Sequence, residues 1–315
     1  MLETNRISEL LESYIEYKHS LGFEIKQEIS VLRNFQRYTL EKDYTGALTK
    51  NIVLEWISSG NQKYKTMGRK IEVLRPFMKY SSFFDSKTEV IYGNIYPNVH
   101  ARPVPYIISE HETLLLMEEC KNLYSPDGIR SQTIKTVIGL LWSTGLRPSE
   151  ATQLKIQDVD TTNNLIHIKN TKYNSERKIP IDPTVSIEIE KYKDFIFKKI
   201  GYKLENDPLF YTTGGKALSQ QSMAYAFKII RKCLNAHPLG YDHVRLYDFR
   251  HTMACRTIKK WLLNKENVNN SLFILSVYMG HKKPEDTYWY LSATPELLNI
   301  ATEKYEEYFG GFDYE

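Results

Sequence analysis

The stretch Ser276-Val-Tyr-Met-Gly-His281-Lys-Lys-Pro-Glu-Asp-Thr-Tyr-Trp-Tyr290-Leu-Ser-Ala-Thr-Pro-Glu-Leu-Leu298 decides how the rest of the sequence is interpreted. It places one histidine after a glycine, then a turn that contains proline, then two tyrosines on either side of a tryptophan. Taken alone, the stretch is compatible with a helix end, a loop and an aromatic packing segment, because aromatic side chains usually belong to a core.

Two other segments change this interpretation. One is Ser143-Thr-Gly-Leu-Arg147-Pro-Ser-Glu150 and the other is Tyr247-Asp-Phe-Arg250-His251. Two guanidinium groups can hold phosphate oxygens in a fixed, bidentate geometry that lysine cannot copy. A phenol can act as the nucleophile that attacks the phosphorus. The three segments together predict an enzyme that grips a phosphodiester and attacks it with a tyrosine.

Length and charge favour two domains and one basic surface. The chain has 315 residues, a hydrophobic fraction of 42% and a formal charge of only +4, so composition alone does not require a nucleic-acid partner. However, residues 61–80 contain six basic residues and one acid. A stripe of this kind is typical of a face that binds a polyanion, although it can also be a solvated helix face.

The remaining composition indicates a cytoplasmic protein without a metal. Cys120, Cys233 and Cys255 are scattered and no pair has the spacing of metal ligands, which favours reduced thiols. The first 16 residues contain five charged residues and so no apolar signal core, and no stretch approaches the roughly 20 apolar residues that span a membrane. We expect no cofactor, no metal and no membrane partner.

Periodicity predicts a helical unit in the first third of the chain. Helices are expected at 5–21, at 26–40, from Thr49 to about 58, and at 65–84, where Pro76 lies inside the last helix. Prolines then accumulate from Tyr96 to Pro105, which suits an extended linker. We therefore predict a helical DNA-binding domain at 1–95, a linker at 96–107 and a second domain at 108–315.

The second domain is predicted to be mainly α-helical with a small antiparallel β-sheet. Ser109 and Glu112 resemble a capping box, and Pro148 suits the first turn of the helix that follows Arg147. Residues 165–168 and 177–181 alternate like two strands around a polar turn that carries Lys172. Helices are expected at about 183–200, at 220–234, where Lys228 and Arg231 lie, at 246–261 and at 271–279.

These motifs, in this order, resemble the tyrosine recombinase, or phage integrase, family. The resemblance rests on Arg147, the Lys172 hairpin, Arg250, Gly280-His281 and Tyr290 nine residues after the histidine, and it covers essentially the whole chain. The ending Tyr-Trp-Tyr-Leu-Ser-Ala-Thr-Pro-Glu-Leu is most similar to integrases of mobile elements. The resemblance implies a helical core-binding (SAM-like) domain followed by a catalytic domain, which would integrate or excise a mobile element.

The resemblance also implies a role for each site residue. Arg147 and Arg250 would clamp the phosphate, His281 would donate a hydrogen bond to it, and Tyr290 would form a 3′-phosphotyrosine. Lys172 would protonate the leaving oxygen, with Lys169 and Lys178 as nearby rivals. Glu150 is expected to orient Arg147, His251 to support the fold, and Tyr288 and Trp289 to pack. Lys63, Lys65, Arg69, Lys70, Lys228 and Arg231 are the predicted DNA-binding residues.

Tyr247 departs from the family pattern, which usually has a histidine three residues before the second arginine. A phenol with an ordinary pKa of about 10 is a poor base at neutral pH. It can still hydrogen-bond a phosphate oxygen or the nucleophile, so the identity of the general base stays open.

The implied partners are double-stranded DNA sites and three further copies of the chain. The amphipathic tail after Pro295 is expected to bury its apolar face on a neighbouring protomer of a tetramer, and accessory DNA-bending proteins or a partner recombinase would fit this scheme. Two alternatives remain: a type IB topoisomerase, which shares the chemistry and acts as a monomer, and a DNA-binding regulator with a weak active site.

Overall fold

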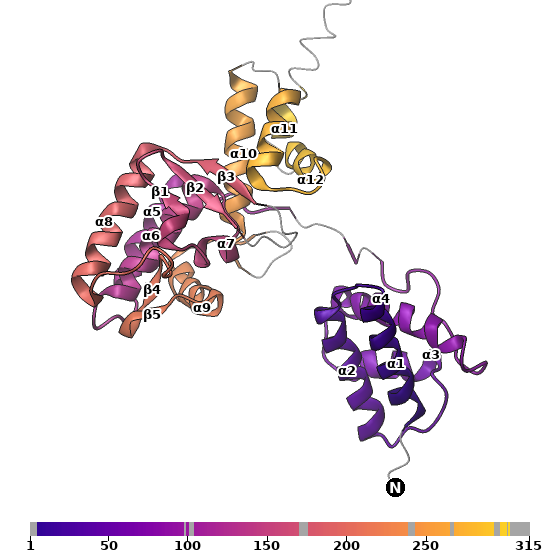
Figure 1. Ribbon diagram of the computed structural model, residues 1–315. Helices are drawn as coiled ribbons and strands as arrows, with labels where there is room; N and C mark the ends of the chain where they lie inside the picture. The colour runs from indigo at the N-terminus through magenta and orange to yellow at the C-terminus, as the bar shows by residue number, and fades with distance from the viewer. Residues whose placement is uncertain are drawn as a thin grey trace, which may run out of the picture. The chain divides into compact units, whose positions relative to one another are not determined.

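The computed structural model describes residues 5–97, 99–100, 104–169, 176–238, 243–264, 268–292, 297–300 and 302. The chain divides into two compact units, Met1–Arg102 and Pro103–Glu315 (Figure 1). The division falls within the 96–107 segment that the prolines mark as a linker. Each unit has its own hydrophobic core.

The first unit is a bundle of helices: α1 (Arg6–Ser20), α2 (Lys26–Glu41), α3 (Lys50–Ser58) and α4 (Tyr64–Ser82). Asn5 caps α1 by accepting a hydrogen bond from the Ile7 N–H at 2.9 Å. Leu11, Leu32, Phe35 and Leu74 lie fully buried between the helices. The helices begin and end within a few residues of the predicted positions.

The second unit is built around α6 (Ile129–Thr144), which packs against helices on several sides. Its partners are α5 (Glu110–Glu119), α7 (Pro148–Thr152), α8 (Pro183–Ile200) and α10 (Asp248–Leu263). The chain also forms α9 (Gln220–Ile230), α11 (Val268–Met279), α12 (Glu285–Tyr288) and the 3₁₀ turn η5 (Trp289–Ser292). The predicted capping box on α5 is confirmed, since Ser109 and Glu112 satisfy each other's backbone N–H groups.

A three-stranded antiparallel sheet lies beside these helices (Figure 1). Its order is β1 (Val159–Asp160), β2 (Leu165–Ile168) and β3 (Arg177–Pro180), and β2 pairs with β3 from Leu165 opposite Pro180 to Ile168 opposite Arg177. The predicted hairpin strands are therefore confirmed, and the fold class is mainly α with small antiparallel sheets. A second sheet, β4 (Tyr211–Thr212) with β5 (Lys216–Ala217), was not predicted, because strands of two residues carry no periodicity.

Gly145 and Gly280 end two helices that deliver site residues. Gly145 closes α6 with φ +61°, and Gly280 follows α11 with φ +65°. Both angles are left-handed, which glycine adopts without steric cost. A Cβ at Gly145 would lie 2.4 Å from the Met253 side chain, so the position also needs a residue without a side chain.

Candidate active site

Arg147 lies at the N-cap of α7, in an extended conformation set by the local sequence. Gly145 ends the preceding helix and Pro148 begins the next one. The Glu150 carboxylate accepts from the Arg147 backbone N–H at 3.0 Å and from Nη1 at 2.7 Å. These are the contacts expected of a residue that orients Arg147 or its helix. The Arg147 side chain stays 26% exposed, so it can meet a ligand.

Arg250 lies in the first turn of α10 and is completely buried. Its Nη1 donates to the Gly145 carbonyl at 3.0 Å, and its Nη2 donates to the Met279 carbonyl at 2.6 Å. Burial lowers the pKa of Arg250. Its Nε is buried without a hydrogen-bond partner among the described residues. A guanidinium has five N–H donors, so Arg250 retains donors for an anion.

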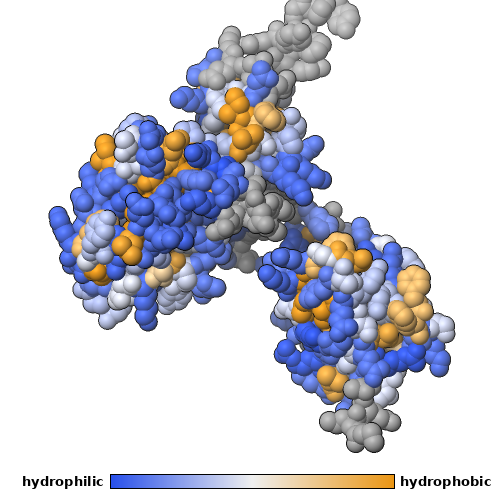
Figure 2. Space-filling model, viewed as in Figure 1, coloured by the Kyte–Doolittle hydropathy of each residue, from blue (hydrophilic) through white to orange (hydrophobic). Residues whose placement is uncertain are grey.

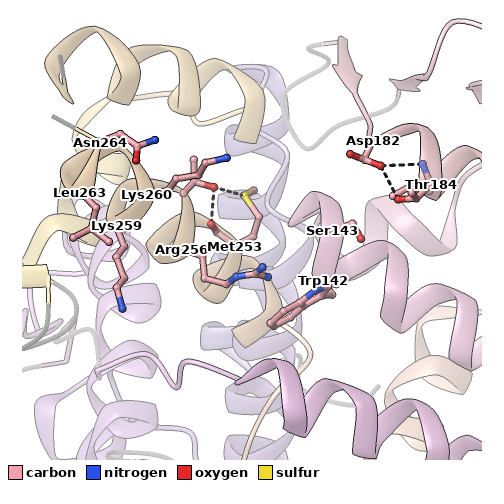
Figure 3. A pocket seen from close by; sticks show the side chains of 12 residues that line it. Trp142, Ser143, Asp182, Thr184, Met253, Arg256, Lys259, Lys260, Leu263 and Asn264 are labelled. Atoms are coloured by element: carbon pink, nitrogen blue, oxygen red, sulfur yellow. Dashed lines mark hydrogen bonds between the residues drawn. The ribbon is translucent and has the colours of Figure 1, made fainter. Parts of the chain in front are cut away.

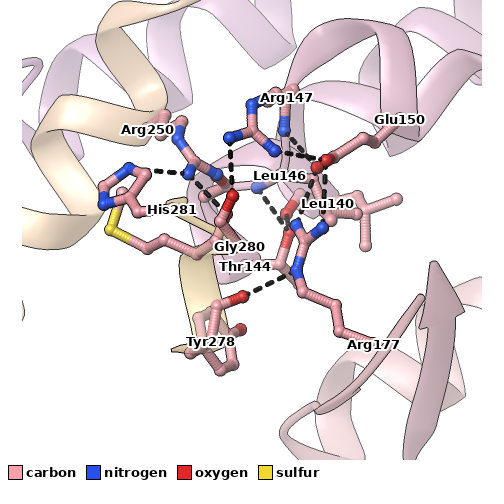
Figure 4. Close-up of polar contacts among 12 residues, drawn as sticks. Leu140, Thr144, Leu146, Arg147, Glu150, Arg177, Arg250, Tyr278, Gly280 and His281 are labelled. Carbon is pink, nitrogen blue, oxygen red and sulfur yellow. Dashed lines mark hydrogen bonds and ion pairs between the residues drawn. The ribbon is translucent and has the colours of Figure 1, made fainter. Parts of the chain in front are cut away.

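The end of α11 joins three arginines. The successive carbonyls of Tyr278, Met279 and Gly280 accept from Arg177 Nε at 2.9 Å, Arg250 Nη2 at 2.6 Å and Arg147 Nη2 at 3.0 Å (Figure 4). The last carbonyls of a helix lack intrahelical partners and carry its negative dipole end. These carbonyls therefore hold the guanidinium groups together against their mutual repulsion.

His281 follows directly and contacts the same cluster. Its Nε2 lies 3.1 Å from Arg250 Nη2, and its Nδ1 lies 2.7 Å from Thr287 Oγ1. Because arginine can only donate, Nε2 accepts and the proton of the neutral ring is assigned to Nδ1. Burial, with Arg250 and Arg147 nearby, lowers the pKa of His281 to about 4. In the chain without DNA, His281 is thus an acceptor toward Arg250 rather than a donor.

Tyr290 lies in η5 and is only 3% exposed. Its ring stacks on His281 at 6.2 Å between centroids and contacts His251 at 5.6 Å. Burial raises the pKa of Tyr290 to about 12, although the Arg250 guanidinium acts in the opposite direction. The phenol is therefore next to the arginine cluster but protonated and enclosed.

Two other tyrosines of the proposed site region, Tyr247 and Tyr288, are far more exposed than Tyr290. Tyr247, at 38% exposed, lies close enough to Arg147, Arg250 and Tyr290 to influence the pKa of each. Tyr288 is 47% exposed, so the prediction that it packs is wrong. Its neighbour Thr287 is fully buried against His281, which turns the Tyr288 side chain outward.

Lys172 lies outside the described residues, but the two strands that lead to it are anchored at the cluster. Arg177 pairs with Ile168 at the end of the hairpin next to the turn, and it contacts both Glu150 and Tyr278. Of the rival lysines, Lys169 donates to Asp158 at 2.8 Å, and Lys178 is exposed on β3. The ion pair makes Lys169 the less suitable proton donor.

Arg177 is the residue that the sequence analysis missed. Its Nη1 and Nη2 donate to the two oxygens of Glu150 at 3.0 and 2.9 Å. The buried Glu150 carboxylate thus binds two guanidinium groups, which outweigh the effect of burial and lower its pKa to about 2. The one indication in the sequence was a charged residue next to the turn of the hairpin, with nothing to identify its partner.

The predicted DNA-binding residues lie on exposed or partly exposed helix positions in both units. Lys63, Lys65 and Arg69 are exposed at the start of α4, whereas Lys70 is half-buried with its Nζ 4.3 Å from the Trp56 ring centroid. In the second unit Lys228 is exposed on α9, and Arg231 donates to the Val244 carbonyl at 3.1 Å. Arg75 donates to the carbonyls of Ile91 and Gly93, so it serves its own unit.

A pocket of about 660 Å³ lies apart from the arginine cluster. It is lined by α10 residues including Arg256, Lys259 and Lys260, and the Arg256 guanidinium lies 3.9 Å from the Trp142 ring centroid (Figure 3). None of Arg147, Arg250, His281 and Tyr290 lines it. This pocket is therefore separate from the arginine cluster.

Within the described part of the chain, no group of three or more His, Cys, Asp or Glu side chains is arranged to hold a metal ion. In the same residues, no helix has the length and apolar character needed to cross a membrane.

Comparisons with known proteins agree with this geometry. The profile of the phage integrase family matches residues 107–296. The chain is 30% identical over 304 residues to a protein of Sinorhizobium fredii named as integrase/recombinase y4rE, with 95% of each chain covered. It is 26% identical to the tyrosine recombinase XerD of Rickettsia prowazekii, covering 82% of this chain and 79% of that one.

Solved structures share the fold. The Tn1549 transposon integrase, in complex with circular intermediate DNA, matches with a TM-score of 0.63 and 19% identity over 94% of this chain and 99% of that one. The matched profile covers all four residues of the described cluster, Arg147, Arg250, His281 and Tyr290. The chain therefore belongs to the phage integrase family and is a site-specific tyrosine recombinase.

Proposed function

We propose that this recombinase cuts and rejoins double-stranded DNA through a covalent 3′-phosphotyrosine at Tyr290, in the integration and excision of a mobile element. The Tyr290 phenol releases its proton to the medium as its oxygen forms a bond to phosphorus, and the bond from phosphorus to the 5′ oxygen breaks. Lys172 gives a proton to the leaving oxygen, a step that contributes roughly 10²–10⁴-fold. Because one ester replaces another, rejoining needs no nucleotide and no metal.

The observation that carries this proposal is the convergence of Arg147, Arg250, His281 and Tyr290 from separate elements. The two guanidinium groups would bind the non-bridging oxygens, where negative charge develops during attack. Tyr290 lies against His281 and under the influence of Arg250, whereas Tyr288 is 47% exposed. This difference favours Tyr290 as the nucleophile.

The burial of Tyr290 implies a conformational step before cleavage. A phenol that is 3% exposed and has a pKa of about 12 cannot reach a phosphate at the surface or lose its proton at neutral pH. We infer that DNA binding releases η5 and brings the phenol to the arginines. The phosphate would also supply an acceptor for His281 once the ring gains a proton.

Two observations support the mobile-element role. The ending around Tyr290 is most similar to integrases of mobile elements, and y4rE is named as an integrase/recombinase. The Tn1549 integrase, which shares the fold, is described in complex with circular intermediate DNA. We therefore propose that the substrates are the ends of such an element and its circular form.

The test is covalent trapping. A pool of duplexes covering the DNA around the chain's own coding region, each nicked so that the 5′-hydroxyl fragment diffuses away, is incubated with protein in excess EDTA. We expect a protein–DNA adduct on a denaturing gel, with peptide mapping placing the DNA on Tyr290. Tyr290→Phe should abolish the adduct and keep DNA binding, whereas Tyr288→Phe should still form it. An adduct on Tyr288, or cleavage that requires magnesium, would contradict the proposal.

Product analysis separates recombination from the alternatives. Two labelled duplexes that carry the trapped site should exchange strands, and the exchange should depend on protein concentration. Relaxation of supercoiled DNA without exchange would indicate a topoisomerase, and binding without any adduct would indicate a regulator.

A further inference from the structure

Arg177 makes more contacts to the cluster than its position on a β-strand suggests. All three of its guanidinium nitrogens donate: Nη1 and Nη2 to Glu150, and Nε to the Tyr278 carbonyl at 2.9 Å. The side chain is only 10% exposed. These contacts use three of its five N–H donors, and they commit the side chain to Glu150 and Tyr278.

The contacts of Arg177 connect β3, α7 and the end of α11. Glu150 Oε1 accepts from both Arg177 and Arg147, at 3.0 and 2.7 Å, so one oxygen fixes the two guanidinium groups relative to each other. Arg177 also packs against Gly280, where an added Cβ would lie 2.8 Å from its Nη1. Gly280 in turn accepts from Arg147 and precedes His281.

We propose that Arg177 is a positioning residue for DNA cleavage: it holds Glu150 and the Tyr278–Gly280 carbonyls so that the Arg147 guanidinium faces the scissile phosphate (Figure 4). This rests on the proposed function. The physical reason is that Glu150 and the phosphate compete for the Arg147 guanidinium. Glu150 is buried, and without Arg177 its carboxylate would have Arg147 as its remaining cationic partner among the described contacts. Arg147 would then be drawn onto Glu150 and away from the phosphate.

Lysine cannot replace Arg177 at this position. A single ammonium cannot donate to both Glu150 oxygens and to the Tyr278 carbonyl with the planar fork that these contacts use. The conservative Arg177→Lys variant keeps the charge and therefore tests geometry alone.

The first experiment compares Arg177→Lys with wild type in single-turnover formation of the covalent adduct. We expect the rate to fall about 100-fold, as small misplacements of catalytic groups do, with near-normal DNA affinity and cooperative unfolding. Arg33→Lys is the matched control, because Arg33 makes a fork-like pair with Glu12 on the surface of the other unit. The control should cleave like wild type.

Two modified substrates identify what Arg177 acts on. A methylphosphonate at the scissile position lacks the negative charge that Arg147 stabilises. The gap in cleavage rate between the Arg177→Lys variant and wild type should therefore shrink. A 5′-bridging phosphorothiolate has a leaving group that needs no proton donor, so the gap should persist. Closure of the gap only with the phosphorothiolate would show that Arg177 acts through the proton donor, and would overturn the proposal.

A double-mutant cycle with Glu150→Gln provides an independent readout. If Arg177 acts through Glu150, the double variant should cleave no more slowly than the slower single variant. Additive losses, or an Arg177→Lys protein that cleaves like wild type, would overturn the proposal. Absence of any adduct with wild-type protein would instead refute the proposed function, so the two failures are distinguishable.

Discussion

Arg147 and Arg250 differ in burial, and this difference predicts different consequences of the same substitution. Arg250 is fully buried and donates to two backbone carbonyls and to His281, whereas Arg147 is 26% exposed at a helix N-cap. Arg250 therefore supports the fold as well as the site, and Arg147 serves mainly the site.

Arg147→Lys and Arg250→Lys should each slow adduct formation by roughly 10²–10³-fold, the cost of removing one donor from a developing anion. Arg250→Lys should also reduce the free energy of unfolding by about 3 kcal/mol, because buried carbonyls lose charged partners. Single-turnover cleavage and urea unfolding measure the two effects. Near-normal cleavage by either variant would assign that arginine a structural role only.

The lowered pKa of His281 predicts that the free energy of unfolding depends on pH. Its folded pKa of about 4 lies below the ordinary value of 6.5, so the unfolded chain binds a proton first as the pH falls. The stabilisation is present above pH 6.5 and is lost between 6.5 and 4, by about 3 kcal/mol. Glu150, with a pKa lowered to about 2, adds a loss that begins below its ordinary 4.5.

Urea unfolding of wild type and His281→Gln from pH 7.5 to 4.5 tests this dependence. The variant should show a flatter profile in this window, since glutamine does not titrate. Two parallel profiles would mean that the imidazole keeps its ordinary pKa in the folded chain.

At the scale of the element, α4 presents its basic residues away from its buried face. Gly68, Ile71, Leu74 and Phe77 face the core, while Lys65 and Arg69, one turn apart, are exposed. Lys70 differs because burial lowers its pKa and it lies over the Trp56 ring. The basic residues at the start of α4 are therefore not equally free to contact DNA.

Alanine at Lys63, Lys65 and Arg69 should weaken DNA binding, and each should reduce the slope of log affinity against log salt by about one. Lys70→Ala should change the slope less, because its ammonium contacts its own unit. Binding titrations at several salt concentrations measure this, with Lys26→Ala on α2 as the control of equal charge. An unchanged slope in the triple variant would show that the stripe is only solvated.

At the scale of the whole molecule, the two leucines of the tail after Pro295 differ in burial. Leu297 is 2% exposed and packs with Cys255 and Met253 of its own unit, whereas Leu298 is 51% exposed. In the single chain Leu297 is thus buried within its own unit, and docking of the tail on a neighbouring protomer stays a prediction. Ala301 and the residues from 303 onward lie outside the described residues.

The surface around α10 and α11 carries exposed apolar side chains. Leu263, Phe273, Ile274 and Val277 are each more than half exposed. Figure 2 shows apolar residues at the surface over this part of the second unit. Neighbouring exposed apolar groups of this kind often mark interaction sites, and the tetramer expected from the sequence stays a prediction that this surface could serve.

Two truncations separate packing within the chain from docking on a neighbour. Ending the chain after Thr294 removes Leu297 and should cost about 1.5–3 kcal/mol of stability, along with synapsis. Ending it after Ile300 keeps Leu297, so stability should stay normal while synapsis is still lost. Analytical ultracentrifugation on DNA measures assembly. Four protomers on DNA with both truncations would show that the tail packs only within its own chain.

The sequence determined the features that depend on neighbours along the chain. The Arg147 N-cap follows from Gly145, Pro148 and Glu150, and the hairpin, the capping box and the two units follow from periodicity and prolines. The resemblance to the tyrosine recombinase family selected Arg250, His281 and Tyr290. These features were predictable because helix caps, turns and strand alternation are local.

Only the tertiary structure decided which of these groups touch, which are enclosed and which are free to react. The bonds from Arg147 to Gly280 and from Arg177 to Tyr278 span 133 and 101 positions, and no local pattern encodes such a distance. The burial of Tyr290, the exposure of Tyr288 and the packing of Leu297 depend on which face of a short element meets α10. The sequence alone therefore predicted which residues take part in the chemistry. Tertiary packing decided how these residues are arranged and enclosed in the chain without DNA.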